Sequence, residues 1–213
     1  MSDPDAVDPT AGDTTAAADA TADPLGLLQT WWDEARERGD GMPDAISLAT
    51  VTPEGSPANR IVIAKRVDET GVVFVTSGTS DKGRELAARP EAAAVFLWPQ
   101  PLRQVRVSGP VEVLDDADSD ELFAVHAPLS RAGFVASRQS EPMDPAALGR
   151  LWERIRDLAE DPDALERPAR WHGYRIVPTA IEFWSQDEER TQTRVQVYRA
   201  TPADPWQQRQ VQP

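Results

Sequence analysis

Cysteine is absent from the 213-residue sequence, and histidine occurs only twice. The absence of cysteine excludes disulfide bonds, thiolate metal sites and cysteine nucleophiles, and it is compatible with a reducing cytoplasm, where we expect the protein. His126 and His172 lie far apart in the sequence, and neither has a carboxylate at ligand spacing. We therefore expect no metal site.

Long apolar runs and the common phosphate-binding and nucleophile motifs are missing as well. A membrane helix needs about 18 or more consecutive apolar residues, so no membrane span is expected. The N-terminus lacks the basic and apolar regions of a secretory signal. The sequence contains neither G-x-G-x-x-G nor a P-loop, and it has no G-x-S-x-G elbow, although a Ser/His/Asp triad stays open on sequence alone.

Basic residues are in the minority: 22 Lys and Arg stand against 36 Asp and Glu, which gives a net charge of −14. A nucleic-acid or anionic-membrane partner is therefore not expected. Residues 1–23 hold six Asp, no Lys or Arg, and almost no large apolar side chain. Such a segment cannot offset its ordering entropy by burial, so we predict a disordered, dispensable acidic tail before a single domain over residues 24–213.

The domain begins with a helix pattern and continues mainly with strand patterns. Asp23 and Pro24 are typical of a helix start, and Gly39 of a helix end. Strands are predicted over Ala45–Val51, Ala58–Val67, Val72–Ser77, Ala92–Trp98, Gln104–Leu114, Trp171–Val177, Ala180–Trp184, Val195–Arg199 and Trp206–Val211. Further helices are predicted over Ser80–Arg89, Asp116–His126 and Pro145–Glu160. This order, without β-α-β alternation, predicts a mainly β fold, an antiparallel barrel with peripheral helices.

Polar and cationic side chains recur at the ends of several of these elements. Arg60 and Lys65 enclose an apolar strand stretch, and Thr76 to Lys82 joins a strand to a helix start, where hydroxyls and free backbone N–H groups can seat a phosphate. Taken singly, each cation is more often part of a structural salt bridge or a solvated face. The order and spacing of the segments carry more information than any one of them.

Six segments in this order resemble the pyridoxamine 5′-phosphate oxidase family, over residues 23–213. They read R-I-V-I-A-K, V-x-F-V-T-S, T-S-x-K-G-R-E-L, R-Q-V-R-V-S-G-P-V-E, R-Q-S and G-Y-R-I-x-P-x-x-I-E-F-W. The resemblance implies an FMN-binding split β-barrel, with the FMN in a cleft between the two subunits of a homodimer. By motif position, the implied cofactor-binding set comprises Arg60, Ile61, Val62, Ile63, Ala64, Lys65, Val75, Thr76, Lys82, Gln104, Gln139, Ser140, Trp184 and Arg194.

The sequence departs from the family pattern at several positions. Asp81 stands where the family usually has Arg beside the phosphate-binding Lys, and Arg84, one helical turn on, is a candidate to replace that cation. On the substrate side, the family's Lys, Tyr, Arg and Ser, which grip the substrate phosphate, correspond to Lys65, Leu122, His126 and Ser130 here. These losses remove charge-assisted hydrogen bonds and indicate a changed substrate.

The family's R-L-H-D-R segment reads Arg190-Thr191-Gln192-Thr193-Arg194 in this sequence. The resemblance implies catalytic and substrate-binding roles for Arg190 and Gln192, with Arg190 orienting an anionic group of the substrate. The alternative for Arg190 is a salt bridge at the rim with Glu188 or Glu189.

The resemblance thus implies an FMN-dependent oxidase of a small molecule, in which the substrate yields a hydride to the flavin and O₂ is the final acceptor, giving H₂O₂. One branch of the family acts in phenazine, and hence antibiotic, biosynthesis, and reduced phenazine precursors are the leading substrate. Two alternatives stay open: an authentic pyridoxine/pyridoxamine 5′-phosphate oxidase that makes pyridoxal 5′-phosphate, and a non-catalytic flavin- or haem-binding protein.

Overall fold

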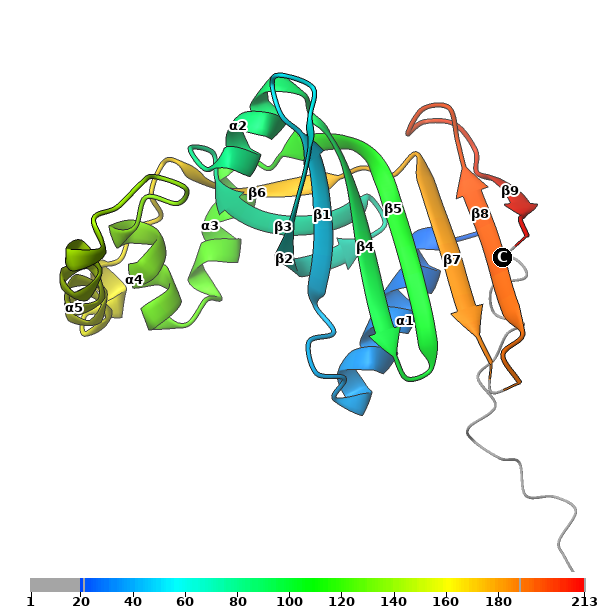
Figure 1. Ribbon diagram of the computed structural model, residues 1–213, viewed down its shortest axis with the longest axis horizontal. Helices are drawn as coiled ribbons and strands as arrows, with labels where there is room; N and C mark the ends of the chain where they lie inside the picture. Colours follow the sequence, from blue (N-terminus) through cyan, green and yellow to red (C-terminus); the bar gives the residue numbers. More distant parts are fainter. Residues whose placement is uncertain (1–19, 21, 188, 213) are drawn as a thin grey trace, which may run out of the picture.

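The computed structural model describes residue 20, residues 22–187 and residues 189–212 (Figure 1). The predicted mainly β fold with peripheral helices is confirmed. The strands are β1 (Ala45–Val51), β2 (Pro57–Asp68), β3 (Gly71–Ser77), β4 (Glu91–Pro99), β5 (Leu102–Val113), β6 (Trp171–Ile176), β7 (Ala180–Gln186), β8 (Gln192–Tyr198) and β9 (Gln207–Gln210). The α-helices are α1 (Pro24–Arg38), α2 (Asp81–Ala88), α3 (Asp116–Ala124), α4 (Pro128–Ala136) and α5 (Leu148–Ala159), with 3₁₀ turns at Pro145–Ala147 and Pro162–Ala164.

All strand pairings are antiparallel, and six of the strands close into a barrel. The strand order is β4-β1-β2-β3-β6-β5, and a further β4–β5 pairing closes the ring. Strands β7, β8 and β9 extend from β5 as an open sheet. The fold is therefore a split barrel, in which β5 belongs both to the ring and to the extension.

The double role of β5 depends on Gly109. Before this residue β5 pairs with β7, from Leu102 to Ser108, and after it β5 pairs with β6, from Val111 to Val113. A Cβ atom at Gly109 would lie only 2.2 Å from the carbonyl oxygen of Val177. A side chain here would therefore push β5 away from the segment that connects β6 to β7.

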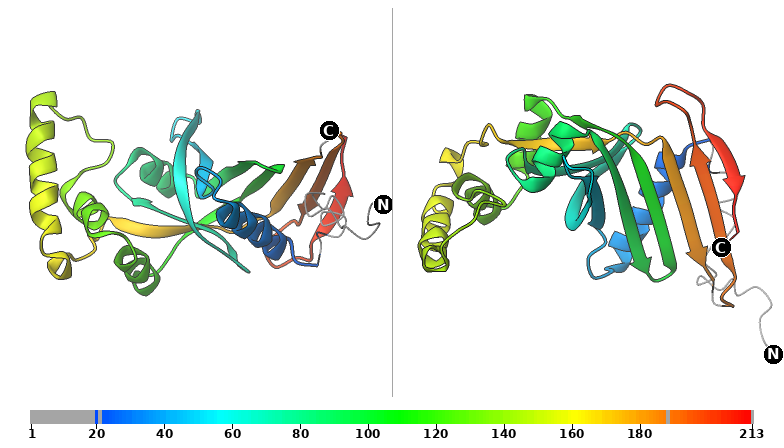
Figure 2. Two further views of the ribbon diagram at one scale, coloured as in Figure 1. Left: turned by 90° about the horizontal axis from the view of Figure 1, so that it is seen from below. Right: turned by 45° about the horizontal axis from the view of Figure 1, so that its top comes forward.

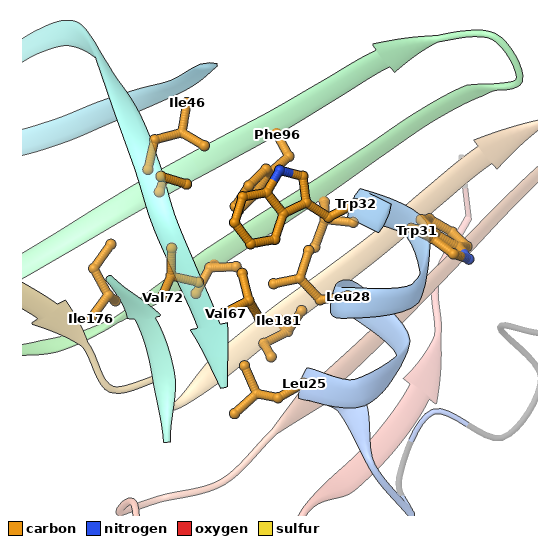
Figure 3. Packing of buried hydrophobic residues seen from close by; sticks show 14 of the residues in the cluster. Leu25, Leu28, Trp31, Trp32, Ile46, Val67, Val72, Phe96, Ile176 and Ile181 are labelled. Atoms are coloured by element: carbon orange, nitrogen blue, oxygen red, sulfur yellow. The ribbon is translucent and has the colours of Figure 1, made fainter. Parts of the chain in front are cut away.

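Helix α1, which is predicted from its start and end signals, covers the core of the barrel (Figure 3). Asp23 caps the helix by accepting a 2.8 Å hydrogen bond from the Gly26 amide, and Gly39 ends it in the left-handed conformation. The fully buried side chains include Leu28, Trp31 and Trp32. Together with strand residues such as Ile46, Val72, Phe96 and Ile181 they form the barrel core.

A second, smaller hydrophobic core lies beside the barrel, where α3 packs. It is built from Val73, Leu114, Leu122, Phe123 and Trp171, against which Phe134 and Val135 of α4 pack. Helices α3, α4 and α5 gather at this end of the molecule, and β7, β8 and β9 lie at the other end (Figures 1 and 2).

Several boundaries differ from the predicted ones. The sequence analysis gave no separate helix at Pro128–Ala136, and the helix predicted to reach His126 ends at Ala124. Strand β8 starts at Gln192 rather than at Val195, which places Gln192 in the sheet. Helix α5 lies within the predicted range Pro145–Glu160, but it is only loosely covered: Ile155 is its one buried residue, and Leu148 and Trp152 are 46% and 48% exposed.

The predicted tail falls mostly outside the described residues, which exclude residues 1–19 and 21. Ala20 is described: it is buried in the barrel core, and its amide donates a 3.0 Å hydrogen bond to Gln208 Oε1. The packed part of the chain thus already includes Ala20. Among the described residues, no helix combines the length and apolarity that a bilayer crossing requires.

Truncation of Leu28 tests the role of α1 in the barrel core. Leu28→Ala is expected to lower the free energy of unfolding by about 2–5 kcal/mol, because it opens a cavity in a fully buried site. The matched Leu148→Ala variant, at a half-exposed site of α5, is expected to lower it by less than about 1 kcal/mol. Urea denaturation measures both, and equal losses would contradict this assignment of the core.

Candidate functional site

The turn between β3 and α2 forms a helix start that is built to face a ligand. Ser80 caps α2 by accepting a 3.2 Å hydrogen bond from the Gly83 amide, and its hydroxyl donates to the Ser77 carbonyl at 2.7 Å. A Cβ atom at Gly83 would lie 2.4 Å from Ser77 O, so glycine lets the first turn pack directly on the preceding loop. The positive end of the helix dipole makes such a helix start favourable for an anion.

Lys82 brings a buried positive charge to this helix start. Its side chain is 7% exposed, and Nζ donates a 3.3 Å hydrogen bond to Thr76 Oγ1. Burial and the charge of Arg60 lower the pKa of Lys82, although Asp81 and Glu85 act in the opposite direction. No carboxylate of the described residues comes within ion-pair distance of this ammonium group.

Arg60 lies near Lys82, but a carboxylate already engages it. Its Nη2 forms a 2.7 Å ion pair with the buried Glu85, and its Nη1 donates to Thr50. The sequence analysis did not foresee Glu85 as the partner. Direct contact of Arg60 with a phosphate stays a prediction, and its charge acts to lower the pKa of Lys82.

Gln139 and Ser140 approach the same helix start from the segment that follows α4. Thr76 Oγ1 donates to Gln139 Oε1 at 3.2 Å, and the Asp81 amide donates to Ser140 Oγ at 3.2 Å. These contacts join four predicted cofactor positions into one group, which we call the helix-start cluster: Thr76, Lys82, Gln139 and Ser140. A pocket of about 200 Å³ opens beside it, lined by Val75, Thr76, Ser77, Phe134, Ser137, Gln139, Arg170 and Trp171.

The acidic residue at position 81 is neutralised locally. Arg84 Nη2 lies 2.6 Å from Asp81 Oδ1, and Arg84 Nη1 also donates to the carbonyl of Thr79. Both side chains are exposed at the first turn of α2. The pair thus places the guanidinium of Arg84 next to the helix start while Asp81 offsets its charge.

A second group of predicted cofactor positions lies on the open sheet. Gln104 pairs with Trp184, and Trp184 pairs with Arg194, so the three residues stand side by side on β5, β7 and β8. They face away from the barrel core, because their neighbours Val105, Phe183 and Val195 are buried in it. We call these three residues the sheet cluster.

Glu182 forms an ion pair with Arg194, which is the cation of the sheet cluster. This carboxylate is 5% exposed and accepts from Arg194 at 3.0 Å, from Arg106 at 3.2 Å and from Gln196 at 2.5 Å. These bonds keep the pKa of Glu182 below its usual value, although burial acts to raise it. The sequence analysis missed Glu182, for which the E-F-W motif was the available signal.

The two clusters occupy different parts of the chain. Within the described residues, no hydrogen bond or ion pair joins the helix-start cluster to the sheet cluster. Helix α2 lies toward the α3–α5 end of the molecule, whereas β7 and β8 form the opposite end (Figure 1). One chain therefore does not bring all predicted cofactor positions together.

The strand stretch from Arg60 to Lys65 contains a β-bulge. The register between β2 and β3 shifts between Ala64 and Arg66, which leaves Lys65 as the extra residue. A bulge re-aims a side chain, and Lys65 is partly buried with a lowered pKa, since burial outweighs the charge of Asp44. Of the apolar positions, Ile61 is exposed, Val62 and Ile63 are half-buried, and Ala64 is buried.

His126, one of the predicted substrate positions, is held as a neutral ring. Its Nδ1 lies 2.6 Å from the carbonyl oxygen of Leu122, so Nδ1 carries the hydrogen and Nε2 is an acceptor. The ring stands edge-on to Phe134 and Trp171 at 5.1 and 5.7 Å. Burial and the charge of Lys65 lower its pKa.

The remaining substrate positions differ in exposure. Leu122 is buried in the second core, where its side chain packs over Gly173, and Ser130 is exposed on α4. Arg190 is exposed in the β7–β8 turn in the left-handed conformation, and Gln192 accepts a 3.4 Å hydrogen bond from Trp184 Nε1.

The alternative role predicted for Arg190 is a salt bridge with Glu188 or Glu189. Glu188 lies outside the described residues. Within the described part of the chain, Arg190 has no ion pair with Glu189, so its guanidinium is not tied to that carboxylate. The contact of Arg190 with a substrate stays a prediction.

Comparison with known proteins gives two matching family profiles. One, described as pyridoxamine 5′-phosphate oxidase, matches residues 33–185, and the other, described as the pyridoxine 5′-phosphate oxidase C-terminal dimerisation region, matches residues 171–213. The second match supports a homodimer. It covers β7 and β8, which carry two of the three residues of the sheet cluster.

Individual relatives agree with these profiles. The chain is 40% identical to the pyridoxine/pyridoxamine 5′-phosphate oxidase of Azorhizobium caulinodans, over 96% of this chain and 94% of that protein, and 40% identical to that of Gluconobacter oxydans, over 83% and 88%. Among solved structures, PhzG from Burkholderia lata, in complex with tetrahydrophenazine-1-carboxylic acid, aligns with a TM-score of 0.85 at 30% identity over 98% of both chains. A pyridoxamine 5′-phosphate oxidase-related, FMN-binding protein from Nostoc punctiforme shares the fold, with a TM-score of 0.72 at 19% identity over 88% of this chain and 96% of that chain. On the profile match and these identities, the chain belongs to the pyridoxamine 5′-phosphate oxidase family.

Proposed function

We propose that the protein is a cytoplasmic, homodimeric, FMN-dependent oxidase of a small molecule, with O₂ as the electron acceptor. The observation that carries the proposal is the buried Lys82 at the start of α2, which donates to the hydroxyl of Thr76 and has no carboxylate within ion-pair distance among the described residues. A buried cation without such a partner is costly unless an anion joins it. The phosphate of FMN is such an anion.

The helix-start cluster fits the phosphate end of the cofactor. Lys82 supplies a positive charge, the start of α2 supplies the positive end of the helix dipole, and Thr76 and Ser140 supply hydroxyls. Bound FMN would supply the redox chemistry, accepting a hydride from the substrate and passing the electrons on to O₂. The protein's own task is to bind, orient and shield the reacting groups.

The flavin ring needs polar contacts that the helix-start cluster does not offer. We assign them to the backbone of Arg60–Lys65 and to Gln104, Trp184 and Arg194 of the second copy in the dimer. Within one chain these three residues lie on the outward face of the open sheet. Glu182 fixes the guanidinium of Arg194, so the contact would be oriented before the ligand arrives.

The substrate side favours a planar molecule without a phosphate. His126 is neutral and offers an acceptor at Nε2, which suits an N–H or O–H donor and repels a phosphate dianion. Leu122 adds apolar surface instead of a phenol. Lys65 and the exposed Arg190 remain to orient a carboxylate, and Ser130 and Gln192 to donate hydrogen bonds.

Reduced phenazine carboxylic acids combine a planar ring, N–H groups and a carboxylate. The solved PhzG structure of the same fold contains tetrahydrophenazine-1-carboxylic acid. This class is therefore our leading substrate. The second candidate function is oxidation of pyridoxine or pyridoxamine 5′-phosphate, which the 40% identity to relatives of that name favours.

Replacement of Lys82 tests the phosphate seat. Lys82→Ala is expected to weaken FMN binding by about ten- to a hundredfold, the value of a charge-assisted hydrogen bond. Binding of riboflavin, which lacks the phosphate, is expected to change little. Fluorescence titration of both flavins measures the effect, and equal losses for FMN and riboflavin would place the phosphate elsewhere.

Asp81→Asn is expected to act in the opposite direction. It removes a negative charge beside the phosphate seat and frees Arg84 from its 2.6 Å ion pair. FMN binding is expected to strengthen by about two- to fivefold, with riboflavin as the control ligand. Weaker FMN binding would show that Asp81 helps to hold the cofactor.

Pyridoxine 5′-phosphate is expected to be a poor substrate. Three polar contacts of the family are absent at Leu122, His126 and Gln192, and a combined loss of about 4 kcal/mol would lower kcat/KM by roughly a thousandfold. Burial and the charge of Lys65 lower the pKa of His126, so this ring is a poorer replacement for the family's arginine cation than an exposed histidine would be. Steady-state assays with this substrate and with reduced phenazine carboxylic acids measure the preference.

The triple variant Leu122→Tyr, His126→Arg and Gln192→His is the matched gain-of-function test. It restores the family residues and is expected to raise turnover of pyridoxine 5′-phosphate. If the unaltered protein already oxidises pyridoxine or pyridoxamine 5′-phosphate at rates normal for an enzyme, the second candidate function is the correct one.

A further inference from the structure

Arg170, which no motif singled out, holds the end of helix α4. Its Nη2 donates to the carbonyl oxygens of Phe134 at 2.7 Å, of Val135 at 3.0 Å and of Ser137 at 2.9 Å. The last carbonyls of a helix lack partners within the helix. The guanidinium supplies those partners and so fixes the point at which the chain leaves α4.

The backbone of the same residue holds the turn that leads into α2. The Gly78 amide donates a 2.6 Å hydrogen bond to the carbonyl oxygen of Arg170. Arg170 directly precedes β6, whose first residue, Trp171, pairs with Ser77 of β3. The pocket has one wall formed by β3 and the turn into α2, and another formed by α4 and the segment after it. Arg170 is hydrogen-bonded to both walls, through its carbonyl to the first and through its side chain to the second.

The segment between these walls needs such support. After Ser137 the chain has no helix or strand until Pro145, and Ser140 adopts φ +69°, a conformation that non-glycine residues rarely hold. The side chains of Gln139 and Ser140 bind the opposite wall through two hydrogen bonds of 3.2 Å each. Two hydrogen bonds of this length are not enough by themselves to hold Ser140 in its strained backbone conformation.

We infer that Arg170 is a positioning residue, which fixes Gln139 and Ser140 against the start of α2 and so sets the width of the cofactor pocket. The inference rests on the proposed binding of FMN. Arg170 acts through Ser140, whose Oγ accepts from the Asp81 amide at the helix start. Its loss is therefore expected to affect the phosphate end of the ligand more than the ring.

Arg167 provides a matched control. It is also a half-buried arginine just before β6, but it binds α3, with Nε 2.5 Å from Asp120 and Nη2 2.6 Å from Asp116. Its third bond, 2.7 Å long, goes to the carbonyl oxygen of Trp171. Arg167 thus anchors the neighbouring helix without bonding to the segment from Ser137 to Ser140.

The test compares Arg170→Met, Arg170→Lys and Arg167→Met in the full-length protein. Arg170→Met is expected to weaken FMN binding by about tenfold, the value of about one hydrogen bond, while riboflavin binding stays within about twofold. Arg170→Lys, which keeps a charged donor, is expected to recover FMN binding to within about threefold of the unaltered protein. Arg167→Met is expected to lower the melting temperature and leave the FMN-to-riboflavin affinity ratio unchanged.

A double-mutant cycle with Ser140→Ala tests whether Arg170 affects FMN binding through Ser140. If Arg170 acts through Ser140, the Arg170→Met/Ser140→Ala protein binds FMN no more weakly than the weaker of the two single variants, since the two changes remove the same contact. Additive losses, or equal losses of FMN and riboflavin affinity on Arg170→Met, would overturn the inference. If the unaltered protein binds no FMN, the proposed function fails and this inference with it; if it binds FMN and Arg170→Met leaves the affinity ratio unchanged, only this inference fails.

Discussion

The architecture depends on the divided pairing of β5. This strand closes the barrel against β4, bonds to β6 at its far end, and starts the open sheet by pairing with β7. The close approach of the Val177 carbonyl at Gly109 makes the division sterically feasible. The position of the sheet cluster follows from it, because Gln104 lies on the part of β5 that supports β7 and β8 rather than on the part that closes onto β6.

Charges in the site are oriented by carboxylates that are themselves buried. Glu85 holds Arg60, and Glu182 holds Arg194, and both acids are less than a tenth exposed. A buried carboxylate is stabilised by the cation and in turn limits the rotamers of that cation, so both guanidinium groups are held in one orientation. Lys82 differs, since it donates its hydrogen bond to the hydroxyl of Thr76 rather than to a carboxylate, and this difference makes it the stronger candidate for binding the anion.

Much of the fold and part of the site could be predicted from local sequence. The cap at Asp23 and the alternation in Ala45–Val51 depend on neighbours within a few residues, and both elements are where the patterns put them. The bulge at Lys65 and the bonds of Arg170 could not be predicted, because they depend on strand register and on a helix 33 to 36 residues away in sequence. The family motifs located Gln104, Trp184 and Arg194, whereas only the register shows that the three stand in a row.

The presence of two separate hydrophobic cores has a consequence for the evolution of this fold. The barrel core with α1 carries no predicted substrate position, whereas Leu122 belongs to the small core beside it and His126 packs on the Trp171 ring of that core. Substitutions that reshape substrate recognition therefore draw on the stability of the smaller core and leave the barrel intact. A lineage can exchange one substrate for another here while the barrel keeps its packing, although Trp171 and Phe134 of the smaller core also line the pocket beside the helix-start cluster and must be kept.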